Sequence, residues 1–313
     1  MKIETVQDPI DAENLGFTLM HEHVMTVNWG MRMTFNNWVD RDTIISNAVN
    51  QLTKAKQFGL ETIVDATPIN LGRDINILHE VAEKSEVQII AATGLYYTEE
   101  PFLSGWSPDK IAEQLAKEAS EGIQGTGIKP GIIKCATTAS SISDANRKLL
   151  QSTALLHKMT GLPVTTHSSS MNKNGLAQQR ILLDEGVNPE KLIIGHCGET
   201  TDLSYLESLL CAGSYIGLDR FGLDDLCPMK SRVDTLFDLC SKGYERQIVM
   251  SHDYNSYIDW WPQDVFSGLK EANWPRWSFH HIMEDVLPFL KDRGVSEKLV
   301  SVILVDNPRR IFS

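Results

Sequence analysis

The segment GFTLMHEH at residues 16–23 and the segment KLIIGHC at residues 191–197 share one pattern. Each contains a short run of apolar or β-branched residues and places histidine at or near its end. Near-continuous apolar runs of this length are typical of strands that are buried on both faces of a parallel sheet. The two segments therefore predict buried strands with polar chemistry at their carboxyl ends.

The same pattern recurs along the chain and alternates with helix-like segments. In residues 142–160, for example, Leu149, Leu150 and Ala154 mark one apolar face at helical spacing, and Gly161 follows where a helix-terminating glycine belongs. The predicted strands cover residues 17–23, 62–68, 88–94, 131–137, 163–169, 191–197, 214–220 and 247–253. The predicted helices cover residues 42–58, 74–84, 109–121, 142–160, 175–185, 202–212 and 232–242.

Eight strand–helix units in one chain predict an α/β protein with a closed (β/α)₈ TIM barrel. An open, doubly wound sheet is the alternative, but no G-x-G-x-x-G sequence follows the first predicted strand. The length of 313 residues would also allow two domains. Single barrels commonly reach this size, and no linker rich in Pro, Gly or Ser interrupts the chain. One domain over residues 1–313 is the simplest interpretation.

Composition narrows the range of partners and compartments. The net charge of -12 disfavours binding to nucleic acid or to anionic membrane surfaces. No apolar run is long enough to span a bilayer, and the opening MKIETVQDPIDAENLG does not resemble a signal peptide. The five cysteines are odd in number and form no C-x-x-C pair, so a disulfide framework is not expected. We expect a cytoplasmic protein that acts on a small molecule.

Polar residues with catalytic or metal-binding chemistry stand at most of the predicted strand ends. In a barrel these ends meet on one rim, which is where active sites form. His21 and His23 are two residues apart, so a strand would direct both imidazoles to one face and Glu22 to the other. The full set of such residues is His21, His23, Asp65, Lys134, His167, His196, Asp219, Arg220 and Asp253.

Each of these residues has an ordinary structural explanation when it is taken alone. A histidine can be a hydrogen-bonded rim residue, Asp253 can cap a helix, and Lys134 can form a salt bridge. Taken together on one rim, they provide enough ligands for two metal ions. Imidazole and carboxylate ligands suit Zn, Fe, Mn or Co rather than Ca.

One predicted connection is unusually long. Residues 254–276, YNSYIDWWPQDVFSGLKEANWPR, show no clear periodicity and are rich in aromatic residues. Long loops in compact domains are usually functional or disordered, and aromatic content argues against disorder. We predict a cover over the substrate in which Tyr254, Trp260 and Trp261 contact it. A contact between subunits is the alternative.

Several of these motifs together resemble a known family. GFTLMHEH, GIIKCAT, VTTHS, IIGHCGETTDLSYL, GLDRFGLD and MSHDY are similar to motifs of the phosphotriesterase-like lactonases of the amidohydrolase superfamily. The resemblance extends from about residue 14 to the carboxyl terminus. It implies a (β/α)₈ barrel with a binuclear metal centre at the carboxyl ends of the strands.

The resemblance also implies the roles of individual residues at that centre. Two divalent ions are expected, zinc first, with cobalt, iron or manganese as alternatives. His21, His23 and Asp253 would hold the more buried ion, His167 and His196 the more exposed one, and Lys134, as N6-carboxylysine, would bridge them. A lysine ammonium would repel cations, whereas a carbamate offers two oxygens and a negative charge.

The activity implied by the resemblance is a lactonase, with N-acyl homoserine lactones or γ- and δ-lactones as substrates and a quorum-quenching role. A homodimer and a weak phosphotriesterase side activity are also implied. Asp253, Tyr96 and Arg220 would be catalytic, and Tyr96 and Arg220 would also contact the substrate. Arg220 would orient Asp253 or gate the pocket, with Glu199 as its partner.

Three other functions remain open at this point. A dedicated organophosphate phosphotriesterase would use the same ligands, although such enzymes usually have a histidine where this chain has Arg220. A non-catalytic barrel that only binds metal would be expected to lack one or more ligands, and none is missing here. In an unrelated barrel, the histidines at the strand ends would be purely structural.

Overall fold

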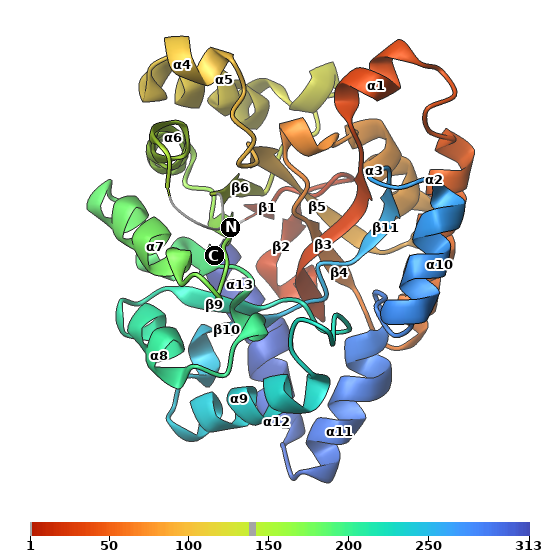
Figure 1. The fold of residues 1–313 in the computed structure, drawn as a ribbon, viewed down its shortest axis with the longest axis vertical. Coiled ribbons are helices and arrows are strands. Elements are labelled where there is room, and N and C mark those ends of the chain that lie inside the picture. The colour runs from red at the N-terminus through yellow and green to blue at the C-terminus, as the bar shows by residue number, and fades with distance from the viewer. Residues whose placement is uncertain (1, 138–141) are drawn as a thin grey trace.

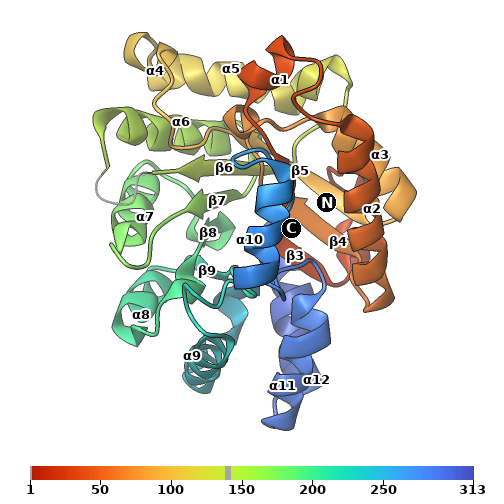
Figure 2. The same cartoon turned by 45° about the vertical axis from the view of Figure 1, so that its right-hand side comes forward.

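The computed structural model describes residues 2–137 and 142–313, which form a (β/α)₈ barrel (Figures 1 and 2). Nine parallel strands form its sheet in the order β10-β9-β8-β7-β6-β5-β4-β3-β11. These strands are β3 (Thr18–Thr26), β4 (Thr62–Asp65), β5 (Gln88–Gly94), β6 (Ile132–Ala136), β7 (Val164–His167), β8 (Leu192–Ile194), β9 (Tyr215–Leu218), β10 (Ile248–Met250) and β11 (Asn255–Ile258). Each of the eight predicted strands coincides with one of them, so the predicted fold class is confirmed.

The sheet closes through an interrupted eighth strand. β10 pairs with β9 on one side and also lies against β3, and β11 then pairs with the carboxyl half of β3. Residues 251–254 break the strand between β10 and β11. The backbone N–H of His23 donates to the carbonyl of Tyr254 across this break, at 2.8 Å. β10 and β11 therefore share the position of the eighth barrel strand.

The seven predicted helices are all present, with side-chain caps at several ends. The side chain of Asp74 accepts backbone N–H groups at the start of α3, and Ser143 does so at the start of α6. These helices are α2 (Arg41–Gln57), α3 (Ile75–Ser85), α5 (Pro108–Glu121), α6 (Asp144–Thr160), α7 (Asn174–Asp184), α8 (Leu203–Cys211) and α9 (Met229–Ser241). The further helices are α1 (Trp29–Thr34), α4 (Phe102–Gly105), α10 (Gln263–Asn273), α11 (Leu287–Asp292), α12 (Glu297–Ser301) and α13 (Asn307–Phe312), with two π-helical stretches at Ile282–Val286 and Val302–Asp306.

The prediction of an irregular segment at residues 254–276 is wrong. The segment contains strand β11 and helix α10, which crosses the barrel opening in Figure 2. Only Phe266 of α10 is fully buried, because the helix covers the barrel from outside and most of its faces meet solvent. α10 therefore stands outside the strand–helix alternation that predicts the other helices.

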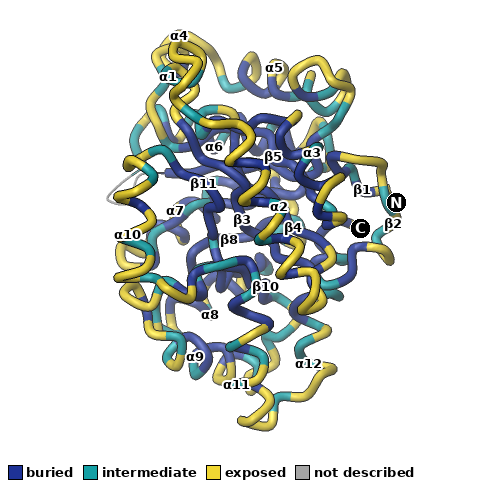
Figure 3. Tube along the Cα trace, turned by 90° about the vertical axis from the view of Figure 1, so that its right-hand side faces the viewer, coloured by how far each residue is buried: buried dark blue, intermediate teal, exposed yellow. Residues whose placement is uncertain are grey.

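The inside of the barrel is filled by apolar side chains from successive strands, and Figure 3 shows the buried chain trace there. The cluster includes Met20, Val64, Ile90, Ala92, Ile132, Ile193, Tyr215 and Val249. Ile3 and Phe312 join this cluster, so the amino- and carboxyl-terminal segments pack together at the amino end of the barrel. There, β1 (Lys2–Ile3) pairs antiparallel with β2 (Ile10–Asp11). The packed interior leaves the carboxyl ends of the strands as the place for a site.

Two further findings concern the whole of the described chain. All five cysteines are free thiols, as their odd number and spacing predicted. No helix among residues 2–137 and 142–313 has both the length and the apolar character needed to cross a bilayer.

Gly94 at the end of β5 gives a test of the close contact between β5 and β6. Its φ is +108°, and a Cβ atom there would lie 2.0 Å from the carbonyl oxygen of Lys134. We expect Gly94→Ala to lower the free energy of unfolding by about 2 kcal/mol or more, because both the backbone and the contact are strained. The measurement is denaturant unfolding followed by circular dichroism.

Gly268→Ala is the matched control. Gly268 lies in α10, and a Cβ there would meet no atom within 4 Å. Alanine should stabilise this helix position by up to about 1 kcal/mol. Equal losses in the two variants would contradict the proposed strain at Gly94.

Candidate active site

The polar residues predicted at the strand ends meet at the carboxyl end of the barrel. They come from well-separated parts of the chain: β3, β6, β7, the turn after β8 and the break between β10 and β11. The metal-ligand candidates placed there are His21, His23, Lys134, His167, His196 and Asp253. Several of them border a cavity of about 240 Å³. Four of these side chains, those of His21, His23, Lys134 and His196, are buried.

Three of the histidines are held from behind through Nδ1. The Nδ1 atom of His21 lies 3.1 Å from Oδ2 of Asp219, and that of His196 lies 2.9 Å from Oδ1 of the same carboxylate. The Nδ1 atom of His23 lies 2.8 Å from the hydroxyl of Thr67. If each Nδ1–H donates in these pairs, each Nε2 keeps a free lone pair. This arrangement is typical of metal-binding histidines.

The Nε2 atoms of these histidines point towards Asp253. Oδ1 of Asp253 lies 3.1 Å from Nε2 of His23 and 3.5 Å from Nε2 of His21. Oδ2 of Asp253 lies 3.9 Å from Nε2 of His196. One carboxylate therefore faces three imidazole nitrogens from two regions of the chain.

Lys134 and His167 complete the same cluster. Nζ of Lys134 lies 2.5 Å from Nε2 of His21, and Nδ1 of His167 lies 2.8 Å from Nε2 of His196. Both Lys134 and His167 also border the cavity. The six predicted ligands thus form one continuous group of nitrogen and oxygen atoms.

Burial and neighbouring charges set the protonation of this cluster. Burial lowers the pKa of His21 to about 3, so its imidazole is neutral. Burial also lowers the pKa of Lys134 to about 8. Burial alone would raise the pKa of Asp253, but the neighbouring His196 and Arg220 outweigh it and hold this pKa well below its usual range. Neutral imidazoles and an ionised carboxylate are the forms that bind metal.

The donor set therefore fits a metal centre. Ligand atoms of His21, His23 and Asp253 lie within 4.8 Å of one another. A second group with the same spacing contains His21, His196 and Asp219. That group is the poorer candidate, because both oxygens of Asp219 are already bonded to the Nδ1 atoms of these histidines.

Arg220 and Tyr96 lie beside this cluster. Nε of Arg220 donates to Oδ2 of Asp253 at 2.8 Å, and its Nη1 contacts Glu199, as predicted for this trio. The hydroxyl of Tyr96 lies 3.3 Å from Nδ1 of His167. Burial raises the pKa of Tyr96, so its hydroxyl stays protonated at neutral pH.

Aromatic side chains form the outer wall of the cavity. Trp260 and Trp261 border it, together with Phe266 of α10 and Trp274, which follows that helix. Tyr254 is placed differently: its buried ring packs edge-on against Trp277 and Phe279. It lies behind the cavity wall, so the structure does not bring it together with the other predicted substrate contacts.

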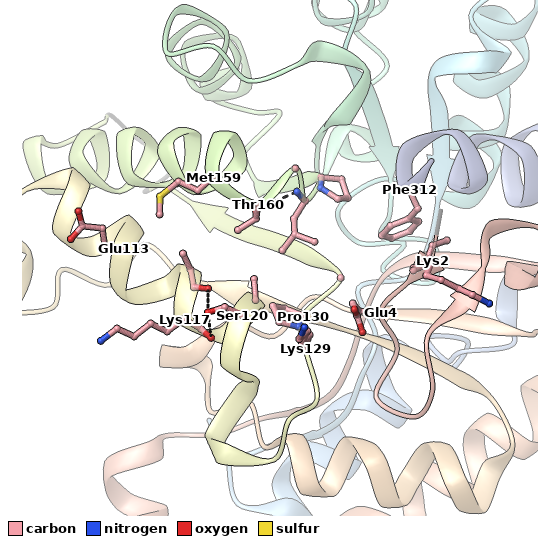
Figure 4. A pocket seen from close by; sticks show the side chains of 17 residues that line it. Lys2, Glu4, Glu113, Lys117, Ser120, Lys129, Pro130, Met159, Thr160 and Phe312 are labelled. Carbon is pink, nitrogen blue, oxygen red and sulfur yellow. Dashed lines mark hydrogen bonds between the residues drawn. The ribbon is translucent and has the colours of Figure 1, made fainter.

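A larger cavity of about 530 Å³ lies at the opposite end of the barrel (Figure 4). It is bordered by Lys2 of β1, by Glu113 and Lys117 of α5, and by the segments that lead into β6 and β7. These segments precede the strands, so the cavity lies at their amino ends. Active sites in barrels of this type lie at the carboxyl ends of the strands. None of the metal-ligand candidates borders this larger cavity.

Comparison with known proteins agrees with this geometry. The phosphotriesterase family matches residues 1–312. This chain belongs to the phosphotriesterase family. It is similar to the phosphotriesterase homology protein of Mycobacterium tuberculosis, at 40% identity over 99% of this chain and 97% of that protein. It is equally similar to an aryldialkylphosphatase of Saccharolobus solfataricus, at 40% identity over 100% of both chains.

A solved structure supports the same assignment. The structure of the phosphotriesterase from Mycobacterium tuberculosis superimposes on this chain with a TM-score of 0.94 at 39% sequence identity. The match covers 100% of this chain and 98% of that one. The protein is therefore a metal-dependent hydrolase of a family whose members have binuclear metal centres.

Sequence reasoning missed the residues that support this phosphotriesterase-family site from behind. Asp219 was recognised only as a polar residue at a strand end, and Thr67 was not singled out. Glu22 was expected to point away from the histidines, which is confirmed, but no role was assigned to it. A carboxylate between two candidate ligands, in an otherwise apolar strand, was the available signal for Glu22.

Asp219 provides a test of the metal centre. We expect the purified protein to bind about two equivalents of Zn²⁺ or Co²⁺ and to lose its hydrolase activity when they are removed by chelation. Asp219→Asn should weaken metal binding by about 10- to 100-fold, because the amide can no longer accept a hydrogen bond from Nδ1 of both His21 and His196. Titration of the apoprotein against a chromophoric chelator measures this affinity.

Asp285→Asn serves as the control for this change. Asp285 also pairs with a histidine, His281, but lies outside the cavity. Its replacement should leave metal affinity unchanged. Absence of bound metal in the wild-type protein would contradict the assignment of the centre.

Proposed function

We propose that this protein is a metal-dependent lactonase that hydrolyses the ester bond of lactones to hydroxy acids. Its proposed substrates are N-acyl homoserine lactones or γ- and δ-lactones. The observation that carries the proposal is the position of Tyr96: its hydroxyl lies 3.3 Å from Nδ1 of the proposed metal ligand His167, and its side chain borders a cavity that aromatic residues also border. The proposed ions, zinc first, would activate a water molecule and polarise the carbonyl of the substrate.

Tyr96 would position the lactone. A protonated phenol can donate a hydrogen bond to the carbonyl oxygen, which gains negative charge as water adds to the carbonyl carbon. The backbone N–H of Tyr96 donates to Oδ1 of Asn70 at 2.6 Å, which fixes the loop that carries the phenol. The hydroxyl is therefore held in place before the substrate binds.

Asp253 would move the proton. It is ionised at neutral pH, so Oδ1 can accept a proton from the attacking water and pass it to the departing alkoxide of the opened ring. Arg220 donates to the other oxygen, Oδ2, and thereby fixes the orientation of the carboxylate. Glu199 holds Arg220 from its far side.

Lys134 would be carboxylated on Nζ and bridge the two ions. Only the neutral amine reacts with carbon dioxide, and burial lowers the pKa of Lys134 to about 8, which raises the neutral fraction at physiological pH. The resulting carbamate would offer oxygen atoms and a negative charge to the proposed ions, at a position where Nζ lies 2.5 Å from Nε2 of His21.

The aromatic wall favours a substrate with an apolar part. Trp260, Trp261, Phe266 and Trp274 border the same cavity as the proposed metal ligands. Such surfaces gain binding energy by burying aliphatic carbon, at about 25 cal/mol per Å². An acyl chain attached to a lactone ring would pack against these aromatic side chains. The carbonyl oxygen of the ring would accept a hydrogen bond from Tyr96.

A dedicated organophosphate phosphotriesterase is the second candidate. The relative named aryldialkylphosphatase, at 40% identity, favours it. The same proposed ions and Asp253 could serve attack on phosphorus. We place lactones first because Tyr96 and Arg220 border the cavity, in agreement with the motifs of the lactonases.

A kinetic panel separates these activities. We expect kcat/KM for an N-acyl homoserine lactone or a δ-lactone to exceed that for paraoxon by at least about 100-fold, given the dedicated polar contacts to the lactone. Tyr96→Phe should lower kcat/KM for lactones by about 100-fold, because a donor to the developing oxyanion is lost. Tyr244→Phe removes a hydroxyl that pairs with Cys211 at the surface and should change nothing. A preference for paraoxon in the wild-type protein would reverse the order of the two candidates.

We also propose that the protein forms a homodimer. The side chains of Trp29, Ile69 and Phe102 are 36%, 37% and 38% exposed and border one surface cavity of about 660 Å³. Trp106 after α4 is also exposed and packs edge-on against Phe102, and Met33 on α1 is exposed as well. Large apolar side chains exposed around a surface cavity are common at protein interfaces, and a second copy of the chain is the proposed partner.

The mass in solution tests this interface. We expect the wild-type protein to have the mass of a dimer by light scattering and the double variant Trp29→Ser, Phe102→Ser to have that of a monomer. Phe237→Ser is the control, since Phe237 is 46% exposed but lies on α9. A monomeric wild-type protein, or a double variant that stays dimeric, would refute the interface.

A further inference from the structure

The carboxylate of Glu22 lies on the side of β3 opposite His21 and His23, and it is completely buried. Its Oε1 accepts the backbone N–H of His252 at 2.9 Å and the Nδ1–H of the same residue at 2.8 Å. Its Oε2 accepts the backbone N–H of Tyr254 at 2.9 Å. One side chain therefore holds the residues immediately before and after Asp253.

Asp253 needs such support because of its own backbone. Its φ is +53°, in the left-handed region that residues other than glycine rarely adopt. It lies in the break between β10 and β11, where regular strand pairing no longer fixes the chain. Its own N–H donates to the carbonyl of His21 at 3.0 Å. The N–H of His23 also donates to the carbonyl of Tyr254 at 2.8 Å. Glu22 adds three bonds to the residues on either side of Asp253.

The turn decides where the carboxylate of Asp253 lies. In the observed conformation, Oδ1 lies 3.1 Å from Nε2 of His23 and 3.5 Å from Nε2 of His21. A relaxed, extended backbone at Asp253 would rotate the side chain away from these nitrogens. On one side of β3, the imidazoles of His21 and His23 face the site. On the other side, the carboxylate of Glu22 holds the turn that carries Asp253.

The same contacts extend to the wall of the cavity. Nε2 of His252 accepts the backbone N–H of Ile282 at 3.0 Å, and the carbonyl of His252 accepts Nε1–H of Trp277 at 2.8 Å. Trp277 borders the cavity. Its indole is thus tied to the segment that Glu22 holds, so the position of Asp253 and the position of this part of the wall are linked.

We propose that Glu22 is a positioning residue that fixes Asp253 in its metal-binding conformation. Glu22 contacts neither the cavity nor the proposed ligand atoms. It acts through the backbone on both sides of Asp253 and through the side chain of His252. The inference rests on the proposed role of Asp253 as a metal ligand. It does not depend on which substrate the enzyme hydrolyses.

The test replaces Glu22 with an amide of the same size. In Glu22→Gln, the side-chain NH₂ must face one of the three N–H donors, so at least one bond to the turn is lost. We expect the affinity of the apoprotein for Co²⁺, measured by competition with a chromophoric chelator, to fall by about 10- to 100-fold. The visible absorption of the Co²⁺ form should change, and kcat at saturating metal should fall more than KM rises.

Glu118→Gln is the control for loss of a largely buried carboxylate. Glu118 forms a bidentate pair with Arg73, and Glu118 does not border the active-site cavity. Both variants should lower the melting temperature, but only Glu22→Gln should weaken Co²⁺ binding. Wild-type Co²⁺ affinity in Glu22→Gln, or an equal loss in both variants, would overturn the proposal and leave Glu22 with a purely structural role.

A second variant keeps the proposal testable if Glu22→Gln does not fold. His252→Gln retains an acceptor that can reach Ile282 but lacks the Nδ1–H that donates to Glu22. It should weaken Co²⁺ binding by a smaller factor, and unchanged affinity would count against the proposal. Failure of the wild-type apoprotein to bind Co²⁺ at all would instead refute the metal site of the proposed function.

Discussion

The carboxylate of Asp219 connects two strands that are not neighbours in the barrel. One oxygen is bonded to Nδ1 of His21 on β3, and the other is bonded to Nδ1 of His196 after β8. The pKa of Asp219 is lowered: burial would raise it, but the charge interaction and hydrogen bond with His196 outweigh that effect. A single buried anion thus sets the tautomer and orientation of imidazoles assigned to both metal positions. The rest of the site depends on this arrangement, because each Nε2 points inward only while its Nδ1 is held.

Much of the fold was predictable because parallel strands buried on both faces leave a plain signal. All eight apolar runs became strands, and the seven clearly amphipathic segments became helices. β11 and α10 were not recognised, for physical reasons. β11 completes a strand already begun by β10, after a break that depends on one left-handed residue. α10 lies over the opening and buries only Phe266 fully, so it is not one of the barrel helices that the strand–helix alternation predicts.

For the candidate site, the residues that face the cavity could be predicted, but most of the residues that support them could not. The inward-facing residues could be named because strand ends in a barrel must converge, and the resemblance to a family assigned them roles. The supporting contacts could not be named, since Asp219, Thr67 and Glu22 act through distances between strands that no sequence pattern reports. Tyr254 is predicted to contact the substrate because it belongs to the aromatic segment 254–276. The turn at Asp253 instead directs that ring into the core behind the cavity.

Left-handed backbone occurs at two of the six proposed metal ligands, His196 with φ of +59° and Asp253 with φ of +53°. Such conformations cost free energy, of the order of 1–3 kcal/mol each, and persist where surrounding contacts enforce them. Here both are enforced in the same way. Asp219 accepts the backbone N–H and the Nδ1–H of His196, and Glu22 accepts the N–H groups on either side of Asp253. Glu22 lies on β3 and Asp219 directly follows β9, and both are buried, so the backbone at the two ligands depends on contacts between adjacent strands of the barrel.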